Sequence, residues 1–509
     1  MTNLISLYDC LKQFAGECPD KILFYDEETV CTAEDVYHQT VSVANQLARS
    51  GLKSGESVAV RMTRSLQTLI VFYAVQSLGA VLFPVDAHGR VSDFISRCDV
   101  KIYPSKIITN EDTSPDISAR CGWVIRDTET GNETRLAFEE FKEDEKPIYN
   151  TKIDINAPAL VIFTSGTTGK GKGVVLSQAN CVSNLLNVHE AGCFKEDDLS
   201  IIGLPLHHVF GLMMAMHAMY SRFALFFPRI TDLGYMAECI DRYQVTRLDT
   251  VPSVAYALAK FMQEKRGLYK MNTLKRGILA GAPASMEQQR FIEDTLGYRI
   301  TPVYGMSECP AIAAANENVS RDKRMGSVGR SLVRNSIAIL SADGSRLPAG
   351  EEGEICVKSP AVMLGYYGDK DATDSVIDGE GRLHTGDLGY MDREGFLHIS
   401  GRIKDIIIRN GNNISGAKVE DALKDLPCVL NAAVVGLNHE VYGEAPYALV
   451  VLDEGCTVDA EKIREMLKDR LLKYELPEKI AIVKEIPMTS SNKTDKEKVR
   501  EIMEKWLTA

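Results

Sequence analysis

Apolar runs alternate with longer amphipathic stretches through most of the chain. The run Ser57 to Arg61 (SVAVR) is typical of a buried strand, and the stretch Ser65 to Leu78 after it is typical of a helix with one apolar face. This alternation continues from about Leu4 to Ser400. It predicts helices layered on sheets, so we expect an α/β fold for this large N-terminal part.

The segment after Gly401 has a different pattern. Strands are predicted at 432–436 and 447–452, and a charged helix is predicted over 461–473. Together they indicate a small α+β unit of about a hundred residues, which lies within the usual range for a domain. With the boundary near 402–405, we expect two domains, a large one over 1–401 and a small one over 402–509.

Thr164 to Gly173 read TSGTTGKGKG, with four glycines, four hydroxyl side chains and two lysines. Glycine lets the backbone approach an anion, and amide, hydroxyl and ammonium groups donate to it, so this stretch predicts a phosphate-binding loop. Strands are expected on either side, at 160–163 and 174–176.

A P-loop is the rival interpretation of this stretch, because Gly166, Gly171 and Lys172 fit the first seven positions of GxxxxGK[ST]. Gly173, however, stands where that motif needs a hydroxyl for Mg²⁺, and a strand rather than a helix is expected next. The pattern therefore favours a different kind of triphosphate loop, with an ordinary glycine turn as the remaining alternative.

Composition limits the classes of function. The 509 residues include 58 basic and 70 acidic side chains, and the resulting charge of −12 gives no overall attraction to nucleic acid or to anionic membranes. Twelve cysteines without a CxxC pair predict neither a disulfide framework nor a thiolate zinc site. No signal peptide or membrane span is recognised. We expect a cytoplasmic protein without integral membrane association.

Seven motifs, which follow one another along the chain in the order of a known family, give the chain a resemblance to that family over nearly its whole length. The chain resembles the adenylate-forming superfamily of acyl-CoA synthetases, luciferases and peptide-synthetase adenylation domains, and it is most similar to AMP-forming acid:CoA ligases. The motifs are TSGTTGKGKG at Thr164, LPLHHVFGL at Leu204, AGAP at Ala280, YGMSE at Tyr304, HTGDLG at His384, GRIKDIIIRNGNNIS at Gly401 and PMTSSNKTDK at Pro487.

The resemblance implies a nucleotide site. Tyr304 would offer a flat face to the base, Ser307 a hydroxyl to a phosphate, and Glu308 a carboxylate to Mg²⁺. Asp387 would bind the ribose hydroxyls, and Arg402 the ribose and phosphate region. The implied nucleotide-binding set is Thr164, Ser165, Gly166, Thr167, Thr168, Gly169, Lys172, Gly281, Ala282, Pro283, Tyr304, Gly305, Met306, Ser307, Asp387 and Arg402.

The resemblance also implies a set of catalytic residues and a mobile C-terminal domain. The implied catalytic residues are Lys493, His208, Glu308 and Thr164. Lys493, in a polar segment that would otherwise be a solvated charge run, would bridge the substrate carboxylate and the α-phosphate, and His208 would lie at the acyl pocket. Lys404 stands at the hinge of a mobile C-terminal lid, and Gly411 would line a tunnel for coenzyme A.

The implied reaction uses ATP, Mg²⁺ and coenzyme A. A carboxylic acid would first become acyl-AMP with release of pyrophosphate, and the acyl group would then pass to the thiol of coenzyme A. No acidic residue lies between Leu204 and Tyr220, which disfavours an α-amino acid and favours a fatty, aryl or related acid. The alternatives are transfer to the phosphopantetheine of a carrier protein, and a nucleotide-binding protein without ligase activity.

Overall fold

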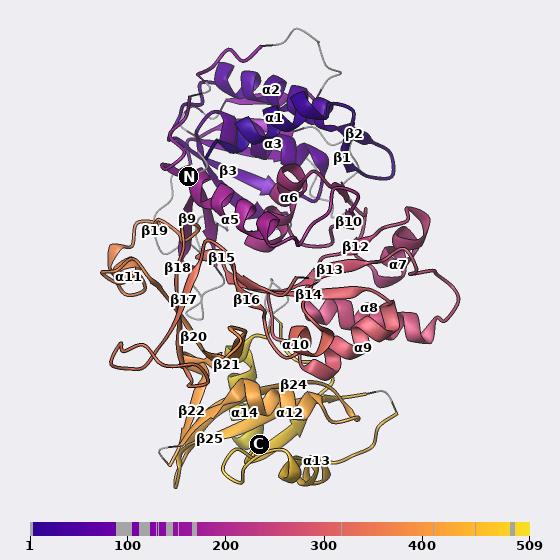
Figure 1. The fold of residues 1–509 in the computed structure, drawn as a ribbon, viewed down its shortest axis with the longest axis vertical. Coiled ribbons are helices and arrows are strands. Elements are labelled where there is room, and N and C mark those ends of the chain that lie inside the picture. Colours follow the sequence, from indigo (N-terminus) through magenta and orange to yellow (C-terminus); the bar gives the residue numbers. More distant parts are fainter. Residues whose placement is uncertain are drawn as a thin grey trace.

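The computed structural model divides into blocks built around separate sheets, with most of the N-terminal part at the top of Figure 1 and the C-terminal part at the bottom. It describes residues 4–87, 104–110, 123–128, 130, 132–138, 146–150, 152–164, 171–316, 318–410, 412–453, 455–488 and 494–508. None of the helices in these ranges is long and apolar enough to cross a lipid bilayer.

An eight-stranded sheet forms the first block. Its central strands β3, β4 and β8 are parallel, whereas β9 returns antiparallel to β8. The strands predicted at 57–61, 160–163 and 174–176 are confirmed as β3, β8 and β9. The order across the sheet is β19 (Gly365–Tyr366), β9 (Gly173–Ser177), β8 (Pro158–Phe163), β4 (Val81–Asp86), β3 (Ser57–Met62), β5 (Lys106–Asn110), β6 (Trp123–Asp127) and β7 (Glu133–Leu136).

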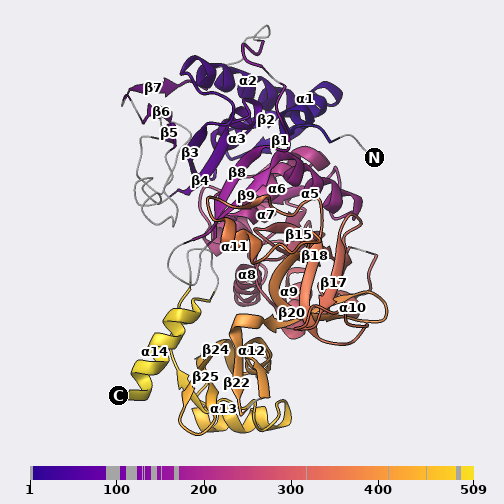
Figure 2. The ribbon, with the colours of Figure 1, turned by 90° about the vertical axis from the view of Figure 1, so that its left-hand side faces the viewer.

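Helices α1 (Leu7–Glu17), α2 (Ala33–Arg49) and α3 (Leu66–Ser77) pack together in this block (Figures 1 and 2). The expectation of an amphipathic stretch at 65–78 was wrong, because α3 is buried on every face. Contacts with α1 and α2 cover the side that would otherwise meet solvent. Its polar side chains bond inside the protein instead, as Gln76 Nε2 does to the Ala159 carbonyl at 3.0 Å.

A nine-stranded sheet forms the second block. Its inner strands are parallel, and the hairpin of β14 and β15 ends it on one side together with β16. The order is β16 (Arg330–Ser331), β15 (Cys309–Ala314), β14 (Arg299–Met306), β13 (Arg276–Leu279), β12 (Arg247–Leu248), β10 (Leu199–Ile201), β11 (Ala224–Phe226), β1 (Ile22–Tyr25) and β2 (Val30–Thr32). The helices of this part are α5 (Gln178–Glu190), α6 (Val209–Ser221), α7 (Leu233–Arg242), α8 (Pro252–Glu264), α9 (Met286–Leu296) and α10 (Arg321–Met325).

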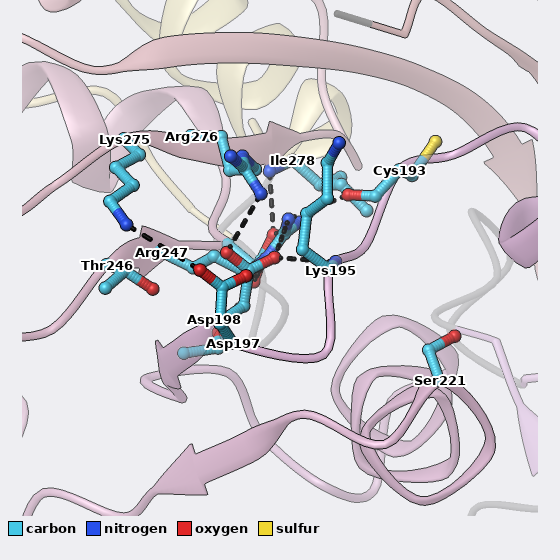
Figure 3. Close-up of polar contacts among 12 residues, drawn as sticks. Cys193, Lys195, Asp197, Asp198, Ser221, Thr246, Arg247, Lys275, Arg276 and Ile278 are labelled. Carbon is cyan, nitrogen blue, oxygen red and sulfur yellow. Dashed lines mark hydrogen bonds and ion pairs between the residues drawn. The ribbon is translucent and has the colours of Figure 1, made fainter.

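A charged cluster lies inside this second sheet (Figure 3). Arg247 is fully buried, and its guanidinium donates to both oxygens of Asp249, at 2.9 and 2.6 Å, and to Asp198 at 3.2 Å. Asp249 also accepts the Ile278 N–H at 2.7 Å. The cluster therefore joins β12 to β13, the strand that leads into the AGAP motif.

Two smaller sheets complete the chain. The first is antiparallel, with β17 (Ser336–Leu340), β18 (Gly353–Lys358), β20 (Leu383–Met391) and β21 (Leu397–Arg402), and α11 (Lys370–Asp374) lies before β20. The turn η1 (Ile403–Asp405) leads to the C-terminal sheet of β23 (Asn412–Ser415), β22 (Ile406–Arg409), β25 (Gly443–Leu452), β24 (Val429–His439) and β26 (Lys479–Ile482). Helices α12 (Gly416–Lys424), α13 (Ala460–Met466) and α14 (Lys496–Thr508) accompany it.

The strands predicted at 432–436 and 447–452 are confirmed as parts of β24 and β25. The helix predicted over 461–473 is too long, because α13 ends at Met466 and a 3-10 turn (Leu467–Asp469) follows. The chain must turn back to pair β26 with β25, and Glu475 holds that turn by accepting the Leu472 N–H at 2.9 Å. The domain boundary near 402–405 stays a prediction.

Candidate active site

The YGMSE motif forms a tight hairpin between β14 and β15. Met306 pairs with Cys309, so Ser307 and Glu308 occupy the turn. A side chain at Gly305 would place its Cβ about 2.1 Å from the Pro310 carbonyl oxygen, so only glycine fits there. The hairpin therefore fixes Tyr304 on one side of the turn and Glu308 at its tip.

Three predicted nucleotide-binding residues meet beside this hairpin. The Tyr304 hydroxyl donates to Asp387 Oδ2 at 2.6 Å, and Arg402 Nε donates to Asp387 Oδ1 at 2.9 Å. Strand pairing sets the second contact, because Asp387 on β20 lies directly opposite Arg402 on β21. Burial and the Asp387 carboxylate raise the pKa of Tyr304, so its hydroxyl stays a neutral donor.

The described ends of the glycine loop approach each other closely. Thr164 N donates to the Lys172 carbonyl at 3.0 Å. A Cβ on Gly171 would lie 2.2 Å from the Thr164 carbonyl oxygen. The close approach of the two strands thus requires glycine at position 171 in this structure. Ser165, Gly166, Thr167, Thr168 and Gly169 lie outside the described residues.

Lys172 and Glu308 are linked through Tyr366, which sequence reasoning missed. The Lys172 ammonium lies 4.8 Å from the centre of the Tyr366 ring, and the Tyr366 hydroxyl donates to Glu308 Oε1 at 2.7 Å. Tyr366 comes from β19, which pairs with β9 directly after the glycine loop. The only local signal was a pair of tyrosines at 366 and 367, and aromatic pairs are common in any strand.

Glu308 fits a divalent cation. The residue is only 8% exposed, and no lysine or arginine of the described chain forms an ion pair with it. A buried carboxylate with a single neutral donor is costly unless a cation joins it, and carboxylate oxygen is a ligand that Mg²⁺ prefers. Its carbonyl accepts the Met363 N–H at 2.8 Å, so the backbone of the turn is held in place.

His208 begins helix α6 as its N-cap residue. Its ring centre lies 4.2 Å from that of His207, whose Nε2 is 3.9 Å from Asp86 at the end of β4. Asp86 is a second residue that sequence reasoning missed, because it lies about 120 positions before the histidines. The sequence contains no acidic residue within the LPLHHVFGL motif, but the fold brings the carboxylate of Asp86 close to it.

The AGAP motif lies near the start of α6. Gly281 has a φ of +87°, and a Cβ there would lie 3.4 Å from Val251 and 3.9 Å from Phe210. Its backbone conformation favours glycine. Ala282 and Pro283 follow in the loop between β13 and α9. The four methionines of α6, Met213, Met214, Met216 and Met219, are all buried in the main hydrophobic core.

The remaining predicted residues concern the C-terminal part. Lys404 lies in the turn η1 between β21 and β22, which is compatible with a hinge. Gly411 and Lys493 lie outside the described residues. The structure thus brings together Tyr304, Asp387 and Arg402, and separately Lys172 and Glu308, while the roles of Lys404, Gly411 and Lys493 stay predictions.

Comparisons with known proteins agree with this geometry. The family profile described as AMP-binding enzyme matches residues 11–367, and the AMP-binding enzyme C-terminal domain matches 418–493. The chain is 31% identical to a 2-succinylbenzoate–CoA ligase of Bacillus thuringiensis subsp. konkukian (strain 97-27), over 97% of this chain and 98% of that protein.

Solved structures are similar over the same length. ATP-bound MatB from Rhodopseudomonas palustris is 25% identical with a TM-score of 0.84, and the match covers 98% of both chains. The o-succinylbenzoate CoA synthetase MenE of Bacillus subtilis, in complex with its acyl-adenylate intermediate, is 25% identical with a TM-score of 0.81, over 97% of this chain and 98% of that one. Another structure of MenE contains ATP and a magnesium ion.

Proposed function

Because this chain belongs to the AMP-binding enzyme family, we propose that it is an acid:CoA ligase that acts on an aryl carboxylic acid. Family membership confirms the predicted superfamily and α/β fold, and relatives that hold ATP and magnesium support the predicted cofactors. In the proposed reaction the acid attacks the α-phosphate of ATP, pyrophosphate leaves, and the thiol of coenzyme A then displaces AMP from the acyl-adenylate.

The Tyr304–Asp387–Arg402 cluster is the observation that carries the proposal. Its residues come from three strands and meet through hydrogen bonds of 2.6 and 2.9 Å. A carboxylate suits the two hydroxyls of a ribose, and a guanidinium beside it suits an adjacent phosphate. The side chain of Arg402 is 49% exposed, so a nucleotide can reach it.

The proposed phosphate contacts lie at the glycine loop. Lys172 would donate to a triphosphate oxygen, and Glu308 would hold Mg²⁺ with the Tyr366 hydroxyl fixing its other carboxylate oxygen. Bound Mg²⁺ offsets the charge of the triphosphate. Lysine and backbone donors near the α-phosphate stabilise the charge that develops there during attack by the acid.

We propose Lys493 as the residue that bridges the acid and the α-phosphate, Lys404 as part of the hinge, and Gly411 as part of the tunnel for coenzyme A. These roles come from the motifs that carry the family resemblance. They predict that the two half-reactions separate on mutation, because adenylation and thioester formation would use different orientations of the C-terminal domain.

An aryl acid rather than a fatty acid is proposed for two reasons. The named CoA ligase relative acts on 2-succinylbenzoate, and the match covers nearly the whole of both chains. In addition, His207 and Asp86 place polar groups beside His208, the proposed acyl-pocket residue. A purely aliphatic chain would gain nothing from these polar groups and would desolvate them.

A panel of acids tests the proposal. Purified protein with ATP and Mg²⁺ is given 2-succinylbenzoate, benzoate, a medium-chain fatty acid or an α-amino acid, and pyrophosphate release is measured. We expect the fastest release with an aryl acid and thioester formation when coenzyme A is added. Release without thioester unless a carrier protein is supplied would support the carrier-loading alternative, and no release with any acid would contradict the ligase proposal.

Two substitutions separate the half-reactions. Lys493→Ala should abolish formation of acyl-AMP and spare thioester formation from added acyl-AMP, and Gly411→Leu should do the reverse. Lys498→Ala is the matched control, because Lys498 is a lysine of the same region whose side chain is 63% exposed and pairs with Asp495. Equal loss of both half-reactions in Lys493→Ala would show that the assigned role is wrong.

A further inference from the structure

Three potential metal ligands meet on the paired strands β18 and β20, outside the proposed nucleotide contacts. Glu354 Oε2 lies 2.8 Å from His384 Nδ1, and Cys356 Sγ lies 3.4 Å from the same nitrogen. All three ligand atoms lie within 4.8 Å of one another. No sequence motif indicated this cluster, because the three positions form no spaced pattern such as CxxC.

Strand pairing explains why Glu354, Cys356 and His384 lie close together. Cys356 on β18 lies directly opposite His384 on β20, and the register shifts between Glu354 and Cys356. Because Glu354 lies opposite Leu388, two positions of β18 face four of β20, so the extra residues belong to β20, the strand of His384. Such a bulge re-aims side chains on the strand that contains it. Glu354 is two positions before Cys356 and therefore on the same face of β18, where it reaches the same histidine. The site is built on strands rather than on loops, which favours a fixed ligand geometry.

We propose that Glu354, Cys356 and His384 form a binding site for a zinc ion. Sulfur, imidazole nitrogen and carboxylate oxygen are the donors that Zn²⁺ takes in proteins, and three protein ligands leave a fourth position for water. Mg²⁺ does not compete well for such a site, because it prefers oxygen ligands alone.

The surroundings match those of a metal site. His384 Nε2 lies 3.5 Å from Asp378, so the nitrogen that would not bind zinc faces a carboxylate that can orient the ring. Arg382 holds Asp378 in turn, with Nε at 2.8 Å. The second oxygen of Glu354 accepts the Gly386 N–H at 3.0 Å, which fixes that side chain and leaves Oε2 for the ion.

Entry of the ion requires a small adjustment. Two ligands with bonds of about 2.0–2.1 Å to a tetrahedral zinc lie roughly 3.3 Å apart, so the 2.8 Å contact of His384 with Glu354 would open by about half an ångström. The thiol proton and the proton between His384 and Glu354 would pass to solvent. The Glu354 and His384 side chains are 21% and 30% exposed, which gives the ion a path.

Zinc titration of the full-length protein tests the site. The protein is first stripped with a chelator, and Zn²⁺ is then titrated against a chromophoric chelator with excess Mg²⁺ present to fill oxygen-ligand sites such as Glu308. We expect one tightly bound zinc per chain. Titration with Co²⁺ should give a thiolate-to-cobalt absorption band in the near ultraviolet, which reports the sulfur ligand directly.

Variants identify the ligands. Cys356→Ser and His384→Gln should each weaken zinc binding at least about tenfold, and Cys356→Ser should also remove the cobalt band. The matched controls are Cys181→Ser, a buried cysteine on α5, and His398→Gln, a histidine 3.2 Å from Asp392 with no cysteine among the contacts of the described structure. Both controls should bind zinc like the parent.

Two results would overturn the proposal. One is a parent protein that binds no zinc or shows no cobalt–thiolate band. The other is zinc binding that is the same in His384→Gln as in the parent. If Cys356→Ser fails to fold, as circular dichroism would show, His384→Gln decides the question, since His384 is partly exposed and its replacement leaves the core intact.

Discussion

Two arginine–carboxylate clusters in this protein have the same chemistry and opposite surroundings. Arg247, Asp249 and Asp198 have side chains with at most 2% exposure, and the guanidinium also donates to the Cys193 carbonyl at 2.7 Å and lies 4.5 Å from the Phe194 ring. Arg402 is 49% exposed and, among the described residues, donates from Nε alone. The first cluster is closed, and the second has donors left for a ligand.

This difference separates structure from function. In the buried Arg247 cluster, removal of one charged residue strongly destabilises the fold, because the remaining charges are left buried and unpaired. An exposed pair contributes little to folding, typically about 0–1 kcal/mol, but its remaining donors can bind an anion. Sequence alone shows only arginines and aspartates in both places, and burial distinguishes the two.

The largest expected effect is on stability, from Arg247→Met. The substitution keeps an apolar stem and removes the charge that Asp249 and Asp198 share, so the free energy of unfolding should fall by about 3–5 kcal/mol. Urea denaturation followed by circular dichroism measures this loss. The control is Arg290→Ala, which removes an exposed ion pair with Asp322 and should cost about 1 kcal/mol or less. Equal losses in the two variants would contradict a stabilising role for the buried Arg247 cluster.

Arg402→Ala should give the opposite result. The loss of a charged donor to the nucleotide should lower kcat/KM for ATP by about 10- to 150-fold, equivalent to roughly 1.5–3 kcal/mol, because a hydrogen bond to a charged group contributes that much. The melting temperature should stay close to that of the parent, as for Arg290→Ala. Full activity together with a lower melting temperature in Arg402→Ala would show that Arg402 stabilises the fold and does not bind the nucleotide.

His217 extends the comparison to pH. Its ring is buried against Phe194, with centres 4.8 Å apart, and burial, with Arg247 nearby, lowers the pKa of His217 to about 3. A histidine with a lowered folded pKa stabilises the protein above its unfolded pKa of about 6.5, and this contribution is lost as pH falls from there toward 3.

At pH 5 the loss should reach about 2 kcal/mol, since one pKa unit corresponds to about 1.4 kcal/mol. In His217→Gln the stability should therefore decline less between pH 7 and 5 than in the parent. Urea denaturation at several pH values measures the two slopes. His398→Gln is the control, because that histidine is partly exposed, and parallel slopes for parent and His217→Gln would contradict the buried neutral ring.

Local patterns predicted what local physics determines. The strands on both sides of the glycine loop follow from apolar runs beside turn residues and were predicted. The hairpin at YGMSE was not predicted and is seen only in the structure. Asp387 and Arg402, which the motifs indicated, are only 15 positions apart and lie on paired neighbouring strands. The full burial of α3 could not be predicted, because α1 and α2 cover it and those helices lie elsewhere in the sequence.

The same limit applied to the candidate active site. Tyr366 reaches Glu308 from 58 positions away, and it does so because β19 pairs with β9, a contact that no short window of sequence contains. Asp86, at the end of β4, reaches His207, which lies in the loop between β10 and α6 about 120 positions later in the chain. The motifs identified residues such as Asp387 and Arg402. The neighbours that contact motif residues, Tyr366 and Asp86, could be identified only from the packing.

The smallest expected effect comes from Tyr304→Phe, which tests how the open cluster works. The variant keeps the aromatic face for the base and removes only the hydroxyl that donates to Asp387 at 2.6 Å. Arg402 still pairs with that carboxylate, so Asp387 is not left without a partner. We expect the KM for ATP to rise by about 2- to 12-fold, equivalent to roughly 0.5–1.5 kcal/mol, with kcat nearly unchanged.

A double-mutant cycle with Arg402→Ala then measures the coupling within the cluster. If Tyr304 and Arg402 hold the same carboxylate, the two losses should not add, and removal of both should cost more than the sum because Asp387 then becomes buried without a partner. Simple additivity would mean that the two residues contact the nucleotide independently. In that case Asp387 would not be the centre of the site, and the contrast with the closed Arg247 cluster would rest on exposure alone.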